Sequence, residues 1–278
     1  MAVTDQQRRF LFLHVMKTGG TSFVFHLLRN FAPTEVYPSE ARDRRYPSDF
    51  EPYASVADLM SLTSERRGEI RVFAGHFPYM VSDLIGIDVV KLTLLREPVD
   101  RTISVLKHFK RLFERYRDLS LDEIYDDELV FRHFVENFQT KVFALTADDQ
   151  PQAFVSNISF QEIFARLRGS RSDEAPSIAA TADETITIDS ERLVRAKANL
   201  DTVDVVGLND GYREFVEELR SRHGWWTGGL DDAARANVSS EPWEAGASLR
   251  ARIARDNRFD VEFYEYAQEL VSDRRREH

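Results

Sequence analysis

A lysine, two glycines and three hydroxyl residues lie together near the start of the chain, in the order Lys17-Thr18-Gly19-Gly20-Thr21-Ser22. The glycines allow a sharp turn and leave backbone N–H groups uncovered. Thr21 and Ser22 stand where a helix would begin, and a helix N-terminus favours an anion. Lys17 adds a full positive charge. The segment predicts a phosphate-binding turn, against the alternative of a plain strand-to-helix turn with a surface lysine.

The position of the lysine separates this segment from the common nucleotide-binding loop. In that loop the lysine follows the last glycine. Here Lys17 precedes both glycines, so it would approach the anion from the strand side. The order of residues therefore disfavours an ordinary ATPase or GTPase.

A second group of residues that could bind phosphate follows the apolar run that ends at Leu95. Arg96 comes directly after this run, and Ser104 lies eight residues later, with Pro98 at a position that the first turn of a helix tolerates. Arginine offers a planar fork for phosphate and serine a hydroxyl donor. We expect this pair to hold a second phosphate. Arg101, one turn before Ser104, would face either that phosphate or solvent.

Together the two segments resemble the two cofactor-binding motifs of sulfotransferases that use 3′-phosphoadenosine 5′-phosphosulfate (PAPS). Residues 17–22 are similar to the loop that binds the 5′-phosphosulfate, and Arg96 with Ser104 to the pair that binds the 3′-phosphate. The branch most resembled contains the carbohydrate and uronyl 2-O-sulfotransferases and their bacterial relatives. Three further segments fit it, within a resemblance over most of residues 8–223: Gly75-His76-Phe77-Pro78-Tyr79, Asn137-Phe138-Gln139-Thr140-Lys141 and Val206-Gly207-Leu208.

The resemblance implies a P-loop-type α/β fold and transfer of a sulfuryl group from PAPS to an acceptor hydroxyl, with a carbohydrate favoured and no metal. Lys17 would lie against the sulfonate and the leaving oxygen. Two alternatives stay open, a P-loop kinase and a non-catalytic nucleotide-binding protein of the same fold. Cofactor binding is assigned to Lys17, Thr18, Gly19, Gly20, Thr21, Ser22, Arg96 and Ser104.

Removal of the acceptor proton needs a base, and His76 is the best candidate. It follows a predicted strand, and an unperturbed histidine has a pKa of about 6.5. It also matches the catalytic histidine of the resembled family. His14 is the alternative base, because it lies next to residues 17–22, which we call the lysine loop. His108 is expected to pack near the cofactor helix. Two interpretations are open for Trp225, Trp226 and Trp243: they stack on adenine, or they anchor a loop on the core.

Composition narrows the function classes. The 278 residues are 42% hydrophobic and 30% charged, which is typical of a globular protein. With 37 Lys and Arg against 47 Asp and Glu, the net charge of −10 disfavours general nucleic-acid binding. The chain has no cysteine, which excludes disulfides, thiolate metal sites and cysteine nucleophiles.

The hydrophobic pattern alternates between strands and helices. It predicts a single α/β domain over residues 1–278, with a mostly parallel sheet flanked by helices and the chemical segments after the strands. The predicted strands are 9–15, 70–74, 89–95 and 203–208. The predicted helical segments are 21–30, 99–117, 121–168, the region after 212, and 246–273 with a break near Asn257. Long loops are predicted at 32–54, 169–184 and 224–242.

No run of apolar residues approaches the length of a membrane span. The run from Phe10 to Leu13 is interrupted at His14 and stops at Lys17, whereas a span needs roughly 18 apolar residues. Arg8-Arg9 before it imitates the start of a signal peptide, but the run is too short for that interpretation. We therefore expect a cytoplasmic protein with no membrane partner.

Overall fold

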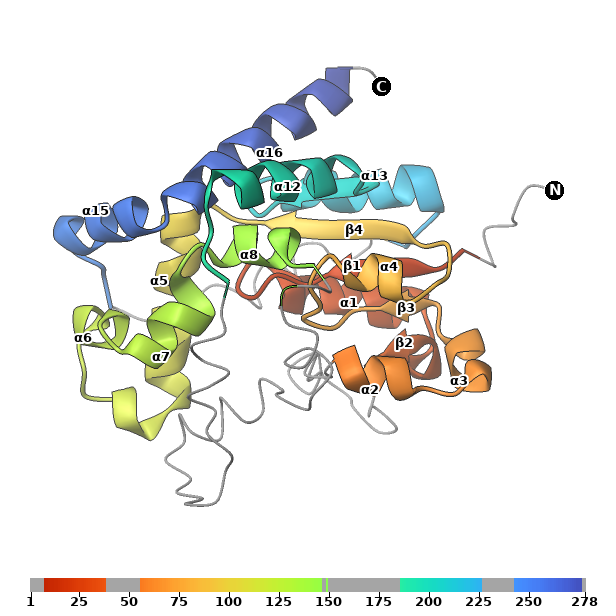
Figure 1. Ribbon diagram of the computed structural model, residues 1–278. Coiled ribbons are helices and arrows are strands. Elements are labelled where there is room, and N and C mark those ends of the chain that lie inside the picture. The colour runs from red at the N-terminus through yellow and green to blue at the C-terminus, as the bar shows by residue number, and fades with distance from the viewer. Residues whose placement is uncertain (1–7, 39–55, 147–148, 150–185, 227–242, 277–278) are drawn as a thin grey trace.

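A five-stranded sheet forms the centre of the molecule (Figure 1). The computed structural model describes residues 8–38, 56–146, 149, 186–226 and 243–276. All four strand pairs are parallel, and the strand order is β2-β3-β1-β4-β5. The prediction of an α/β protein with a parallel sheet flanked by helices is confirmed. The strands are β1 (Phe10–Leu13), β2 (Val36–Tyr37), β3 (Val72–Phe73), β4 (Val90–Leu95) and β5 (Val205–Leu208).

Helices cover both faces of the sheet, because alternate residues of each strand point to opposite sides. Phe10 and Phe12 of β1 pack in one hydrophobic cluster with α1 (Gly20–Asn30) and α13 (Tyr212–His223). Leu11 and Leu13 pack in the other. That larger cluster takes its side chains mainly from α5 (Pro98–Leu112), α6 (Leu121–Tyr125), η5 (Phe131–Val135), α8 (Phe138–Ala144), α12 (Ser190–Asp201), α15 (Ala247–Asp256) and α16 (Arg258–Arg276).

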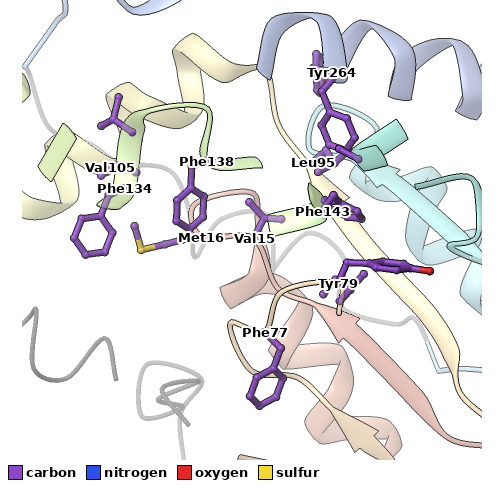
Figure 2. Close-up of a cluster of buried hydrophobic side chains, with 14 of the residues drawn as sticks. Val15, Met16, Phe77, Tyr79, Leu95, Val105, Phe134, Phe138, Phe143 and Tyr264 are labelled. Atoms are coloured by element: carbon purple, nitrogen blue, oxygen red, sulfur yellow. The ribbon is translucent and has the colours of Figure 1, made fainter. Parts of the chain in front are cut away.

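The larger cluster reaches up to the turns that follow the strands. Figure 2 shows Val15 and Met16 from the turn after β1 in this cluster, together with Phe77 from the turn after β3 and Leu95 from the end of β4. The backbone of the lysine loop is thus seated on packed apolar side chains. The short elements that complete the fold are η2 (Pro33–Glu35), α2 (Val56–Ser61), α3 (Ser64–Glu69), α4 (Val81–Leu84), η4 (Glu114–Tyr116) and α7 (Glu128–Val130).

Two predicted boundaries are wrong. The helix predicted over 99–117 ends at Leu112, because Phe113 is extended and the chain continues as the 3-10 turn η4. The loop predicted over 32–54 contains η2 and the edge strand β2, whose Val36 and Tyr37 pair with β3. A two-residue strand is too short to give a periodic signal. The break predicted near Asn257 is confirmed, since that residue separates α15 from α16.

Parts of the predicted loops lie outside the described residues: 39–54, all of 169–184, and 227–242. The same holds for most of the helical segment predicted beyond residue 146. Among the helices that the structure describes, none combines the length and the apolar character needed to cross a membrane.

The strand order decides where a ligand would bind. Strand β1 lies between β3 and β4, so the turns after β3 and β4 leave on either side of the turn after β1. Ligands of open parallel sheets bind beyond the carboxyl ends of the strands, where connections diverge to the two sides. In Figure 1 these ends point toward α5.

Candidate functional site

The three segments singled out in the sequence meet at the carboxyl edge of the sheet. His76, after β3, donates from Nδ1 to the carbonyl of His14 at 2.6 Å. Arg96, after β4, donates from Nη1 to the carbonyl of Lys17 at 3.3 Å. Asn209, after β5, donates from Nδ2 to the carbonyl of Thr18 at 2.9 Å. The turn after β1 is therefore held by side chains from the ends of three other strands.

Five successive carbonyl groups of this turn accept side-chain hydrogen bonds. Across a trans peptide the carbonyl and the next N–H point in opposite directions, so each following N–H is directed away from the donor that holds its peptide. The arrangement fixes the direction of the loop amides, as an anion-binding turn requires. The pairs are His76 Nδ1 with His14 O, Thr18 Oγ1 with Val15 O, Arg101 Nη1 with Met16 O, Arg96 Nη1 with Lys17 O, and Asn209 Nδ2 with Thr18 O.

Two residues of the loop have a left-handed backbone conformation, with a positive φ. Gly19 has φ of 113°, and Lys17 has φ of 69°, which is unusual for a residue with a side chain. Glycine adopts this conformation readily, but for a residue with a side chain it costs of order 1–3 kcal/mol and persists where the surroundings hold it. Gly20 is needed for a different reason: a Cβ there would lie 1.7 Å from Nε2 of His14. The two glycines thus serve a turn and a close approach.

The ammonium of Lys17 has no hydrogen-bond or ion-pair partner among the described residues. Burial lowers its pKa to about 8, with a further lowering from the charges of Arg111 and Arg96. At pH 7 the lysine is still mainly charged. Three cations thus gather here, with no carboxylate in the described part of the chain paired to Lys17, in a protein whose net charge is −10. An anion would supply the missing counter-charge.

One face of α5 borders the loop. Arg101, Ser104, His108 and Arg111 recur at spacings of three and four residues, so they share this face. Burial lowers the pKa of His108 most, and the nearby charges of Lys17 and Arg111 lower it further, to about 3. Ser104 is partly exposed and has no hydrogen-bond partner within the described residues. Arg111 was missed in the sequence, although its spacing from Ser104 places it on the same face.

Arg101 does not face a ligand or solvent, the two positions that the sequence left open. Its side chain is fully buried, and Nη2 donates to the carbonyl of Phe134 at 2.7 Å, while Nη1 holds the carbonyl of Met16. Arg96 is the arginine left for an anion. Of the two carboxylates nearest to its charge, Glu97 caps α5, and Asp100 pairs with Arg250 at 2.7 Å.

His14 and His76 are stacked. Their ring centroids lie 4.2 Å apart, and Phe12 stacks on the other face of His14 at 5.1 Å. Burial lowers the pKa of His76 to about 4, against a smaller rise from its bond to the His14 carbonyl. Burial also lowers the pKa of His14 well below its usual value. Both rings are neutral at pH 7.

The bond to a carbonyl also sets the tautomer of His76. A carbonyl oxygen only accepts, so Nδ1 carries the proton and the lone pair of the neutral ring is on Nε2. His14 is the more enclosed of the two, with an exposed fraction of 8% and its ring against the Gly20 backbone. The ring of His76 is therefore the less enclosed of the two, and the ring of His14 packs against it.

The remaining predicted site residues lie in or beside α1. Thr18 is fully buried, and its hydroxyl is bound within the loop, so only its backbone is left for a ligand. Ser22 is buried in the first turn of α1, and the side chain of Thr21 lies outside the described residues. Trp225 packs on Phe10 and Phe31 in the core, so it anchors its segment and does not stack on a ligand.

No protein-family model matches the chain, and a search of the curated proteins finds no match.

Proposed function

We propose that the protein is a PAPS-dependent O-sulfotransferase with a P-loop-type fold, which transfers a sulfuryl group to an acceptor hydroxyl, with a carbohydrate favoured. The observation that carries the proposal is the unpaired charge of Lys17, beside Arg96 and Arg111, in a turn where five successive carbonyls, from His14 to Thr18, accept side-chain hydrogen bonds. PAPS carries anionic groups at two ends, and the site offers cations from the ends of two strands. We also propose that it acts in the cytoplasm.

The residues fit the donor in the following way. The amides of residues 18–22 and the start of α1 would hold the 5′-phosphate, since the first-turn amides of a helix have no intrahelical acceptor. Arg96, with Ser104 beside it on α5, would hold the 3′-phosphate. Lys17 would face the sulfonate and the leaving oxygen, where negative charge develops.

The transfer balances as an in-line displacement. The acceptor oxygen forms a bond to sulfur, and the bond from sulfur to the bridging oxygen of the 5′-phosphate breaks. Adenosine 3′,5′-bisphosphate (PAP) leaves with the electron pair of that bond. Nε2 of His76 takes the acceptor proton, since Nδ1 is already protonated.

The electrostatics of the site suit this sequence of events. Before the donor binds, burial and, to a smaller extent, the Lys17 charge lower the pKa of His76 to about 4, so it is a weak base. An anionic donor beside Lys17 would compensate that charge and raise the pKa of His76. The base would thus be strengthened when the donor is bound.

The proposal is tested by comparing ligands that differ in the 3′-phosphate. PAP should raise the melting temperature without added metal, and 5′-AMP should do so much less, because a ligand that binds the native state stabilises it. Equal shifts for the two ligands would remove the assignment of a 3′-phosphate site, and a strict need for magnesium would favour a kinase.

Arg96→Met should weaken PAP binding by roughly tenfold or more, on the scale of one charged hydrogen bond. It should weaken 5′-AMP binding less, because for that ligand only the bond that holds the Lys17 carbonyl is lost. Arg115→Met is the matched control, because Arg115 is exposed and pairs with Asp127 away from the loop. Titration calorimetry gives both affinities. Retention of the preference for PAP in Arg96→Met would show that another residue reads the 3′-phosphate.

A further inference from the structure

Gln139 holds the main chain of Arg96 with two hydrogen bonds. The N–H of Arg96 donates to Oε1 of Gln139 at 3.0 Å, and Nε2 of Gln139 donates to the carbonyl of Arg96 at 2.8 Å. The side-chain amide thus pairs with Arg96 on both sides, as a neighbouring strand would. Gln139 is fully buried at the start of α8.

A buried carboxylate in turn holds the backbone of Gln139. Asp260 in the first turn of α16 accepts from Gln139 N at 3.1 Å, from Thr140 N at 2.7 Å and from Thr140 Oγ1 at 2.7 Å. Its exposed fraction is 1%. Because a buried carboxylate is costly unless its oxygens are hydrogen-bonded, these three donors fix the position of α8 relative to α16.

Three further hydrogen bonds join the starts of the same two helices. Asn137 N donates to Oδ1 of Asn257 at 2.8 Å, and Oδ1 of Asn137 accepts from Phe259 N at 3.2 Å and Asp260 N at 3.3 Å. Asn137 has φ of 44°, a left-handed conformation that asparagine tolerates. The start of α8 is thus joined to the start of α16 at both Asn137 and Asp260.

We propose that Gln139 is a positioning residue for the anion site: it fixes the main chain at Arg96, and so the direction of the guanidinium, while Asp260 fixes Gln139. The chain of bonds runs from α16 through α8 to the end of β4, and from Arg96 to the carbonyl of Lys17. The identity of the ligand in this inference rests on the proposed function. The geometry of the anchor does not.

The test compares Gln139→Met with Asn199→Leu. Methionine has a similar length and can make neither bond to Arg96. Asn199 also donates to α8, from Nδ2 to the carbonyl of Phe143 at 2.7 Å, but has no contact with Arg96, so its loss controls for weakened attachment of the helix. The first measurement is hydrogen exchange of the Arg96 amide by NMR. The second is the ratio of PAP affinity to 5′-AMP affinity.

In Gln139→Met the Arg96 amide should exchange roughly tenfold faster, and the affinity ratio should fall by roughly tenfold, while Asn199→Leu should leave both unchanged. An unchanged exchange rate at Arg96 in Gln139→Met would overturn the anchor. Faster exchange with an unchanged ratio would overturn the link to the anion site.

The two proposals fail separately. If the parent protein does not bind PAP, the proposed function is wrong, and the exchange measurement still decides whether Gln139 anchors Arg96. If Gln139→Met is too unstable to study, Gln139→Glu replaces it. Its carboxylate still accepts from Arg96 N, so the Arg96 amide should stay protected, but it cannot donate to the Arg96 carbonyl, so the affinity ratio should still fall. An unchanged ratio in Gln139→Glu would overturn the link to the anion site.

Discussion

Two regions of the molecule enclose lysines in opposite ways. At the end of β1, Lys17 has cations around it and no partner in the described part of the chain. In α8, Lys141 donates from Nζ to the carboxylate of Glu136 at 2.9 Å and to the carbonyl of Arg132 at 3.3 Å. Burial lowers the pKa of both lysines, but Glu136 opposes the shift at Lys141.

The same contrast holds for the groups around each lysine. The cluster between α8 and α16 is closed: Gln139, Thr140 and Asp260 find their partners within it. The region around Lys17 is open in the sense that no carboxylate in the described part of the chain pairs with the lysine ammonium. Unpaired charge that is partly buried weakens the fold, and its presence points to a ligand. Paired polar groups that are buried point to architecture.

The largest effect that we expect is the loss of turnover when His76 is replaced. His76→Ala should lower turnover by ~10²–10⁴, because a general base contributes on that scale, and should leave PAP binding nearly intact. Single-turnover kinetics with an acceptor found by screening measures it. His223→Gln is the control, since His223 contacts Arg8 and Phe10 elsewhere. A parental rate in His76→Ala would make His14 the next residue to replace.

Replacement of the two lysines tests the comparison directly. Lys17→Met should lower turnover by ~10²–10³, through loss of charge at the leaving oxygen, and should not lower the free energy of unfolding. Lys141→Met should do the reverse, because it leaves Glu136 without its partner. Kinetics and denaturant unfolding of both variants decide the point. Loss of stability in Lys17→Met would show that the lysine has a structural partner.

The pH profile of kcat/KM reports the free protein and should be bell-shaped. Its ascending limb should lie near pH 4, because His76 must be neutral, and its descending limb near pH 8, because Lys17 must be charged. Lys17→Arg should move the descending limb to higher pH in whatever activity remains. A descending limb unchanged by that substitution would assign it to another group.

Removal of the Asp260 carboxylate should lower mainly the free energy of unfolding, and turnover less. Asp260→Ala leaves two backbone N–H groups and the Thr140 hydroxyl without an acceptor, beside the buried charge of Arg101. We expect a loss of about 3 kcal/mol in the free energy of unfolding. Urea unfolding measures it. A loss below about 1 kcal/mol would mean that the cluster is less closed than its hydrogen bonds indicate.

A last effect is the dependence of stability on pH. The folded-state pKa values of His76 and His108, about 4 and about 3, lie below the usual value of 6.5, so the unfolded chain binds more protons. Stability should fall as pH drops from 6.5 toward 4, by at most about 1.4 kcal/mol per unit for each histidine. Melting curves between pH 7 and 5 test this. PAP should oppose the loss only if it binds near these rings.

Local patterns in the sequence were enough to predict most of the architecture. Hydrophobic runs predicted the strands around Leu11, Leu92 and Val205, and the break near Asn257 was predicted as well. The lysine loop and the spacing of Arg96 and Ser104 were visible because each is a short segment whose residue types have a fixed chemistry. Short strands such as Val36–Tyr37 carry too few residues for a periodic signal.

Only the tertiary structure decided the division of roles within the site. The sequence favoured Arg96 as the phosphate ligand and left open whether Arg101 faces the phosphate or solvent, and burial under η5 gives Arg101 neither position. Three contacts of the site join residues that are far apart in the chain. They are the stacking of His14 on His76, the hydrogen bond from Asn209 to Thr18, and the bonds between Gln139 and Arg96. The identity of a residue determines which bonds it is able to make. Folding determines which partners come within reach and how far water is excluded, and these two quantities set the pKa values and directions on which the chemistry depends.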